Sequence, residues 1–156
     1  MARQKQIYAR PALCCGCRTC ANACALVHRG ETNPRLGAIR IRQNLVERYE
    51  FQELCRHCAD APCVDACMTG CLSKDERTGL VVQDRERCVG CWMCLMVCPY
   101  GAIGRDVGRE VAIKCDRCAG RDKPACVTVC PTGALVLENR EDAPVEPFFT
   151  EPTVAG

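Results

Sequence analysis

Cysteine dominates this chain, with eighteen Cys among 156 residues. Sixteen of them form four groups of four, and every group opens with C-x2-C and closes with C-x3-C. The groups are Cys14, Cys17, Cys20 and Cys24; Cys55, Cys58, Cys63 and Cys67; Cys88, Cys91, Cys94 and Cys98; and Cys115, Cys118, Cys126 and Cys130. The first and third groups read C-x2-C-x2-C-x3-C, and the other two lengthen the middle gap. The chain must therefore fold around whatever these thiols bind.

The compact spacing is that of cysteine ligands to 4Fe-4S clusters. Three thiolates at i, i+3 and i+6 can hold three corners of one cube, and a distant cysteine supplies the fourth. Four groups therefore predict four 4Fe-4S clusters, bound through iron by the sixteen cysteines. Structural zinc would leave the third cysteine of each compact group idle. Four C-x2-C pairs in a chain whose N-terminus lacks an apolar leader also argue against disulfides.

The remote fourth ligand can be supplied in two ways, and the spacing alone does not choose between them. Sequential pairing joins neighbouring groups, whereas nested pairing joins the first group with the fourth and the second with the third. Nested pairing gives four ligand sets: Cys14, Cys17, Cys20 with Cys130; Cys115, Cys118, Cys126 with Cys24; Cys55, Cys58, Cys63 with Cys98; and Cys88, Cys91, Cys94 with Cys67.

The composition suits a chain with an inorganic interior. Hydrophobic residues make up 48% on a count that includes cysteine, and aromatic residues only 4%, so cluster binding must contribute to the free energy of folding. The formal net charge of +2 treats every cysteine as neutral; four clusters of about two negative charges each would bring it to about -6. Lys and Arg are scattered, which indicates counter-charges and docking surfaces rather than nucleic-acid binding.

No stretch approaches the length of apolar sequence that spans a membrane. Reduced cysteines at this density suit the cytosol, so we expect a cytoplasmic protein with no direct membrane span. A folded partner with its own export signal could still carry the chain across a membrane.

The pattern predicts an α+β fold of short strands and short helices. We expect strands over residues 6–10, 38–43, 80–83, 111–114 and 134–138, and helical turns over 17–28, 61–68, 91–97 and 124–129. Pro99 and Pro131 should stop helices just after the last cysteine of their groups. Gly70, Gly101 and Gly133 should form tight left-handed turns there.

Several residues beside the groups need separate interpretation. Cys15 is out of step with the spacing, and we expect it to pack beside a cluster. Cys71 is expected to be a buried thiol. His28 and His57 each lie beside a complete cysteine set, which favours hydrogen bonding over ligation. Trp92 is expected to shield a cluster.

The C-terminal segment, residues 139–156, contains proline and acidic residues but no cysteine. Two interpretations stay open, a disordered end and a tail that anchors Phe148 and Phe149 on a partner subunit.

The chain resembles the four-cluster ferredoxin-like electron-transfer subunits of molybdenum and tungsten oxidoreductase, carbon monoxide dehydrogenase and hydrogenase complexes. The motifs that carry the resemblance are CCGCRTCANACALVH, CRHCADAPCVDAC, CVGCWMCLMVCPYGAI and KCDRCAGRDKPACVTVCPTGAL. The resemblance implies nested pairing and two bacterial-ferredoxin-like dicluster units, an outer one of residues 1–54 plus 104–138 and an inner one of 55–103. Ala25 and Met68 depart from the family pattern, which usually has Pro there.

Within that family, HRGETNPRLGAIRIR resembles the small iron-sulfur subunit of tungsten aldehyde oxidoreductases. The implied partners are a large tungsten- or molybdenum-pterin catalytic subunit and a second redox protein such as a flavoprotein, in an anaerobic setting. With every iron held by cysteine and no catalytic constellation visible, we expect no catalysis by this chain itself. The alternatives are a free-standing soluble polyferredoxin and an electron-conducting assembly of stacked copies.

Overall fold

The computed structural model describes residues 5–47 and 49–139. This part of the chain holds eight short strands and four α-helices. The strands are β1 Lys5–Ala9, β2 Arg40–Asn44, β3 Tyr49–Glu53, β4 Leu72–Lys74, β5 Val81–Gln83, β6 Gly104–Asp106, β7 Val111–Ile113 and β8 Leu135–Asn139. The helices are α1 Thr19–Arg29, α2 Pro62–Asp65, α3 Met93–Val97 and α4 Ala125–Thr128, with 3-10 turns at Pro11–Leu13, Pro34–Leu36 and Arg85–Arg87.

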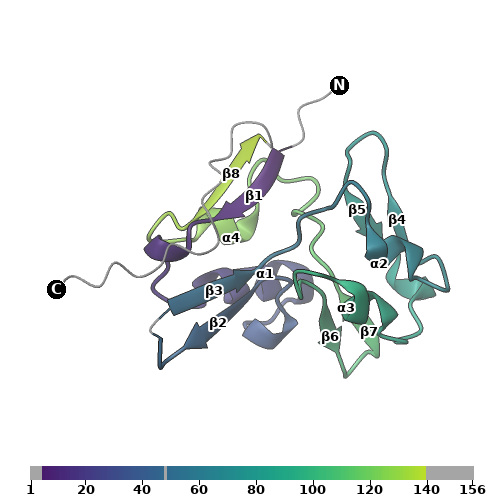
Figure 1. Cartoon of the computed structure of the whole chain (residues 1–156), viewed down its shortest axis with the longest axis horizontal. Helices are drawn as coiled ribbons and strands as arrows, with labels where there is room; N and C mark the ends of the chain where they lie inside the picture. The colour runs from purple at the N-terminus through teal and green to yellow at the C-terminus, as the bar shows by residue number, and fades with distance from the viewer. Residues whose placement is uncertain (1–4, 48, 140–156) are drawn as a thin grey trace.

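The first and last strands of the described chain pair with each other. β1 and β8 are antiparallel and in register from Lys5 opposite Asn139 to Ala9 opposite Leu135. The inward side chains of this ribbon include Ile7 and Leu135, each 3% exposed. Below the ribbon α1 packs against α4 (Figure 1). The loops of the first and fourth cysteine groups are thereby brought together, although about a hundred residues separate them in sequence.

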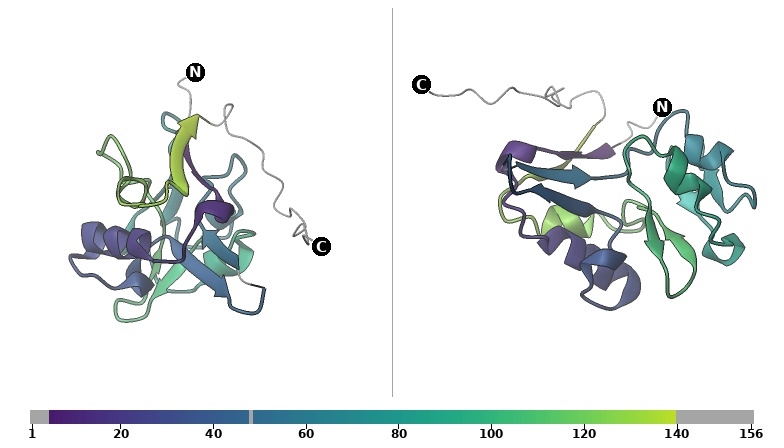
Figure 2. Two further views of the ribbon diagram at one scale, coloured as in Figure 1. Left: turned by 90° about the vertical axis from the view of Figure 1, so that its left-hand side faces the viewer. Right: turned by 60° about the horizontal axis from the view of Figure 1, so that its bottom comes forward.

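The middle of the chain forms the other half of the molecule. β4 pairs with β5, β6 pairs with β7, and α2 packs against α3. These elements lie on the right in Figure 1 and in the right-hand view of Figure 2, beside the first half. The buried side chains form two apolar clusters, one containing Ile7, Ile39 and Leu135 and the other containing Leu72, Val81 and Ile103.

The short elements agree with the expected α+β character, with differences at particular places. All five expected strands occur within two residues of their predicted starts, but β3, β4 and β6 were not predicted. β4 and β6 read Leu-Ser-Lys and Gly-Arg-Asp, which carry little strand propensity, and their hairpin partners hold them in place. Gly70, Gly101 and Gly133 do adopt left-handed backbone, with φ of 62°, 57° and 68°.

Proline marks the end of two of the four helices. α3 and α4 end before Pro99 and Pro131, as predicted. The first group has Ala25 in place of proline, and α1 runs for eleven residues, from Thr19 to Arg29. The prediction for residues 61–68 was too long, because α2 ends at Asp65. Within the described residues, no helix is long and apolar enough to cross a membrane.

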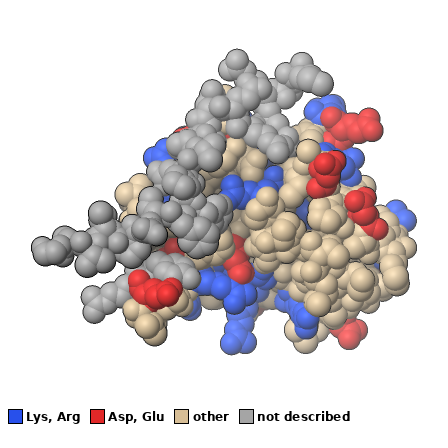
Figure 3. Space-filling model, in the orientation of Figure 1, with Lys and Arg blue, Asp and Glu red and all other residues tan. Residues whose placement is uncertain are grey.

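Buried polar contacts join the two halves. Arg29 at the end of α1 pairs with Asp106 of β6 at 3.1 Å, and their side chains are 2% and 7% exposed. Arg40 of β2 donates to the carbonyl oxygen of Ile103 at 3.1 Å. On the face seen in Figure 3, Lys and Arg atoms gather between the positions of β2 and β6. Burial lowers the pKa of Arg29, and the carboxylate of Asp106 opposes that shift.

We predict that Asp106→Asn strongly destabilises the protein, because it leaves the Arg29 guanidinium buried without its counter-charge. The expected cost is about 3–5 kcal/mol, or on the order of a 10 °C fall in the thermal midpoint. The measurement is thermal loss of the visible absorption of the iron-loaded protein. Glu138→Gln is the matched control, because Glu138 pairs with Arg10 at 3.2 Å near the surface and should cost less than about 1 kcal/mol. Equal shifts for both variants would contradict the prediction.

Candidate iron-sulfur cluster sites

A left-handed residue occurs at the same place in all four cysteine groups. It stands directly before the second cysteine of each C-x2-C: Gly16 with φ 67°, His57 with φ 43°, Gly90 with φ 65° and Arg117 with φ 58°. In two groups the residue is not glycine, which is unusual for this backbone region. Such a turn curls the chain and points successive amides toward one space. The loops therefore share one local geometry despite their different middle gaps.

A cavity of about 340 Å³ is bordered by cysteines of the second and third groups. Its sulfur-bearing lining consists of Cys55, Cys58, Cys63 and Cys98, that is, three cysteines of one group and the last of another. Burial raises the pKa of the Cys63 thiol, and negative charge on Cys55 and Cys98 adds to the shift while Lys114 opposes it. These four thiols are thus close enough to share a charged ligand.

A second cavity, of about 330 Å³, has the same construction in the other half. Its cysteines are Cys14, Cys17 and Cys20 of the first group, Cys130 of the fourth, and Cys15 at its edge. Burial raises the pKa of Cys20 to about 12, with charge on Cys14, Cys17 and Cys130 contributing. The lining also includes the hairpin residues Ile41 and Gln52.

Electrostatic interactions also link cysteines of distant groups among the remaining eight. Burial raises the pKa of Cys126 to about 12, and charge on Cys24 and Cys118 adds to it. Burial raises the pKa of Cys94 to about 11, and charge on Cys88, Cys67 and Cys91 acts in the same direction. Here too the last cysteine of one group, Cys24 or Cys67, lies with cysteines of a distant group.

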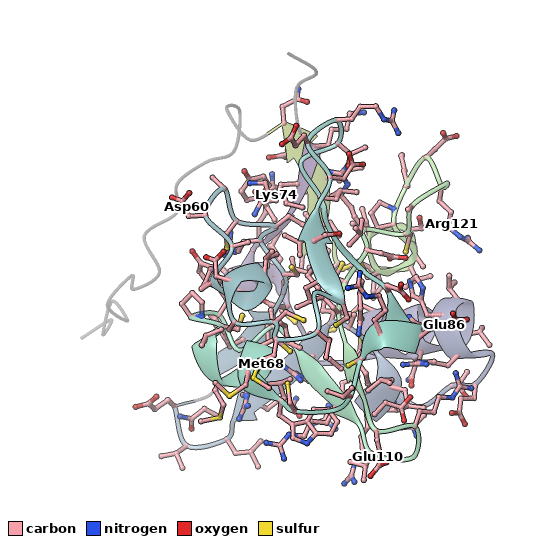
Figure 4. The ribbon with its side chains drawn as sticks, turned by 90° about the vertical axis from the view of Figure 1, so that its right-hand side faces the viewer. Asp60, Met68, Lys74, Glu86, Glu110 and Arg121 are labelled. Atoms are coloured by element: carbon pink, nitrogen blue, oxygen red, sulfur yellow. The ribbon has the colours of Figure 1, made fainter. Side chains whose placement is uncertain are left out.

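The donor sets fit iron-sulfur clusters. Each contains four sulfur atoms, and sulfur atoms gather in the interior of the molecule between the ribbons (Figure 4). With pKa values raised by burial, several of these groups are neutral thiols at pH 7 when no iron is bound. Iron must displace those protons, because the thiolate is the ligand.

Backbone amides donate to several of these sulfurs. The amide of Ala38 lies 3.3 Å from Cys24 Sγ, that of Ala102 lies 3.4 Å from Cys98 Sγ, and that of Arg117 lies 3.3 Å from Cys115 Sγ. Thr69 and Thr132 place hydroxyls 3.8 and 3.7 Å from Cys67 and Cys130. Hydrogen bonds to ligand sulfur are one of the means by which a protein sets the potential of a cluster.

The two cysteines outside the groups differ in environment. Cys71 is 4% exposed, which confirms the prediction of a buried thiol. Its Sγ lies 3.4 Å from Cys67 Sγ, and burial together with this contact raises the pKa of Cys71 to about 12. Cys71 is therefore a buried thiol hydrogen-bonded to Cys67. Cys15 is exposed at the edge of its cavity.

Both histidines make hydrogen bonds or close polar contacts, as predicted. His57 is 5% exposed, and its Nδ1 accepts the amide hydrogen of Val81 at 3.1 Å. Burial, helped by the charge of Lys114, lowers the pKa of His57 to about 3, so its ring is neutral. His28 Nε2 lies 3.4 Å from Asp116 Oδ1 and 3.6 Å from Cys118 Sγ.

Two further residues complete the surroundings of the sites. Trp92 lies under the guanidinium of Arg105, 5.4 Å from ring centre to Cζ. The sequence pattern did not single out Lys114, although it stands directly before Cys115. It is 5% exposed and contacts Cys55 Sγ at 3.4 Å.

Residues 46–140 match a family described as "4Fe-4S dicluster domain". The chain is 39% identical over 127 residues to the beta subunit of an NADH-dependent phenylglyoxylate dehydrogenase from Aromatoleum evansii, covering 80% of this chain but only 28% of that subunit. It is 36% identical over 155 residues to the electron transport protein HydN of Escherichia coli, covering 86% of this chain and 87% of HydN.

A solved structure of the BamBC complex of benzoyl coenzyme A reductase contains a chain with a similar fold. The TM-score is 0.54 at 22% sequence identity, with 87% of this chain and 80% of that chain covered. At this identity the similarity concerns the fold alone.

We predict that Gly90→Ala damages the loop of the third group. A Cβ at Gly90 would lie 2.4 Å from the carbonyl oxygen of Glu110, and φ there is +65°. Steric overlap and a left-handed alanine together should cost about 3 kcal/mol. Gly120→Ala is the control, because φ is +89° there but nothing lies within 4 Å, and it should cost about 1 kcal/mol. The measurement is the thermal midpoint of each iron-loaded variant, and equal losses would contradict the steric argument.

Proposed function

The chain belongs to the 4Fe-4S dicluster family, and from this premise we propose that it is an electron-transfer subunit of an oxidoreductase complex. It would hold four 4Fe-4S clusters and catalyse no substrate reaction of its own. The observation that carries the proposal is the pair of cavities, each lined by three cysteines of one group and the last cysteine of a distant one. When bound, each cluster supplies one-electron redox chemistry.

The ligand sets of the proposal are the nested ones. They are Cys14, Cys17, Cys20 and Cys130; Cys115, Cys118, Cys126 and Cys24; Cys55, Cys58, Cys63 and Cys98; and Cys88, Cys91, Cys94 and Cys67. The pairing of β1 with β8 supports the proposed outer unit of residues 1–54 plus 104–138. The proposed inner unit, residues 55–103, supplies most of the second apolar cluster, which Ala112 of β7 joins. Asn139, the first residue of the proposed tail, is the last residue of β8, and the remainder, with Phe148 and Phe149, lies outside the described residues.

Neighbouring charges support a linear order for the four sets. Cys20 of the first set adds to the raised pKa of Cys126 in the second. Charge on Cys55 of the third set likewise raises the pKa of Cys115 of the second. Charge on Cys63 raises the pKa of Cys94 of the fourth. These interactions support a proposed order of the sets from the outer unit to the inner unit, as electron transfer between two docking faces requires.

Exposure at both ends of this order supports docking there. Cys17 and Cys91, in the two terminal sets, are exposed. Near the inner end, Met68 and Met96 are 78% and 76% exposed, and Met68 stands at the lower part of Figure 4. In the hairpin beside the outer end, Val46 is 91% exposed. Exposed apolar side chains of this kind are typical of partner surfaces.

The partners we propose are a catalytic subunit of tungsten- or molybdenum-pterin type, as in tungsten aldehyde oxidoreductases, and a second redox protein such as a flavoprotein. The support is the sequence resemblance described above and the similarity to a subunit of an NADH-dependent dehydrogenase. We propose a cytoplasmic location, because reduced thiols at this density suit that compartment.

We predict about sixteen irons per chain in anaerobically prepared protein, and a specific pattern of losses on cysteine replacement. Cys14→Ala and Cys130→Ala should each remove about four irons, and the double variant should also remove about four, because both residues serve one cluster. Cys14→Ala with Cys67→Ala should remove about eight. Iron and acid-labile sulfide analysis measures each loss.

Sequential pairing, in which Cys67 rather than Cys130 completes the set of Cys14, predicts the reverse. The Cys14 and Cys130 double variant would then lose about eight irons, and the Cys14 and Cys67 double variant about four. Cys71→Ala is the control for the loss of any buried thiol, and it should retain all the iron. Zinc in place of iron, or far fewer than sixteen irons in the unaltered protein, would overturn the proposed function.

We also predict that the full-length chain, affinity-tagged in its native host and purified without oxygen, is recovered with a larger redox subunit. Analysis of the complex for tungsten and molybdenum identifies the type of that subunit. Recovery of the chain alone would favour a free-standing polyferredoxin, whereas long stacks of the chain in electron microscopy would favour a conducting assembly.

A further inference from the structure

Lys114 is a buried lysine at the boundary between the two halves of the molecule. It follows β7, precedes Cys115 and is 5% exposed. Its Nζ donates hydrogen bonds to the carbonyl oxygens of Val81 at 2.8 Å and of Cys115 at 3.0 Å. A third contact joins Nζ to Cys55 Sγ at 3.4 Å. The ammonium group therefore contacts both the inner β5 strand and the loop of the fourth cysteine group.

No carboxylate among the described residues pairs with this ammonium. Among residues 5–47 and 49–139, no Asp or Glu oxygen lies within 4.0 Å of Lys114 Nζ. The other buried cation at the boundary, Arg29, has Asp106 at 3.1 Å. Burying a charge without a partner is strongly unfavourable. The compensating negative charge must come from another kind of group.

The sulfur sets on either side of Lys114 can supply that charge. Cys55 belongs to the proposed set with Cys58, Cys63 and Cys98, and Cys115 to the set with Cys118, Cys126 and Cys24. The two sets meet here, because the same Nζ contacts Cys55 Sγ at 3.4 Å and the carbonyl oxygen of Cys115 at 3.0 Å. A 4Fe-4S cluster with four thiolate ligands carries about two negative charges. Lys114 thus lies where two anionic groups approach each other.

We propose that Lys114 supplies the positive charge at the junction between the two middle clusters and thereby raises both of their reduction potentials. An added electron on either cluster is stabilised by a nearby cation in a buried site. The effect is larger for the cluster of Cys55, since Nζ donates to its ligand sulfur, and smaller for that of Cys115. The inference rests on the proposed function, because it takes these sets as cluster ligands.

A purely structural role for Lys114 is the competing explanation. Lys114 holds the carbonyl of Val81 while His57 Nδ1 accepts the amide hydrogen of the same residue at 3.1 Å. Val81 itself is 1% exposed. These bonds tie the inner half to the loop of Cys115, and their loss alone would lower stability. A structural tie, however, would not change the potentials of two particular clusters while leaving the others unchanged.

The test is an anaerobic redox titration of the full-length, iron-loaded protein, followed by electron paramagnetic resonance. Lys114→Met keeps the length of the side chain and removes the charge, and two of the four potentials should shift to more negative values. Lys114→Arg keeps the charge and should restore both toward the original values. Cys98→Ala and Cys24→Ala identify the two signals, because each variant removes the remote ligand of one middle set.

Lys74→Met is the matched control. Lys74, labelled in Figure 4, is exposed and donates to the carbonyl oxygen of Cys58 at 3.0 Å, so it belongs to the surroundings of the same cysteine set. Solvent and salt screen its charge, and its replacement should shift the potential of the Cys55 set much less than Lys114→Met does.

Unchanged potentials in Lys114→Met, or an equal shift of all four, would overturn the inference. If the methionine variant does not load iron, Lys114→Gln, which keeps a hydrogen-bond donor without the charge, is titrated with the same expectation. Failure of the proposed function is a separate outcome, because it shows as missing iron in the unaltered protein. If the unaltered protein holds all its iron but the potentials do not change in Lys114→Met, the inference about Lys114 is rejected and the proposed function stands.

Discussion

The pairing of β1 with β8 places the two ends of the described chain in one ribbon, and the rest of the outer half depends on it. Each cysteine loop supplies three closely spaced thiols, but a cubane needs a fourth. The ribbon sets Cys130 beside the loop of Cys14, and the packing of α1 on α4 sets Cys24 beside Cys126. In the nested arrangement that we propose, strand pairing and helix packing between distant segments thus complete two sets of sulfur donors that no local segment could complete.

The interior combines few large apolar side chains with many thiols. Two small apolar clusters each include cysteines among their members. Burial raises the pKa of thiols such as Cys20 and Cys126, so without metal these side chains are protonated and lack the bonds that iron would add. The folded state we propose therefore obtains much of its stability from cluster binding, since metal binding in such a site is folding free energy.

The two halves have apolar interiors, whereas the boundary between them contains buried polar and charged side chains. Arg29 with Asp106 forms a buried ion pair there, whereas Lys114 is buried with carbonyl and sulfur partners. The two cations have different physical requirements. Arg29 is compensated by a side chain, so its role is to join α1 to β6. Lys114 is compensated only if the sulfur sets carry negative charge, which links the boundary to the redox state of the protein.

The sequence by itself determined the type of cofactor, the groups of cysteines, and the helix ends and turns set by proline and glycine. These properties depend on residues only a few positions apart. It also predicted that Cys71 is buried and that the histidines form hydrogen bonds. Only the tertiary structure decided which distant cysteine lies beside which loop. It also decided that His57 and Arg117 adopt the left-handed turn that Gly16 and Gly90 adopt elsewhere, and that Lys114 lies between two sulfur sets. These features depend on the path of the chain between residues far apart in sequence, and on packing that overrides local preference, so no spacing rule could supply them.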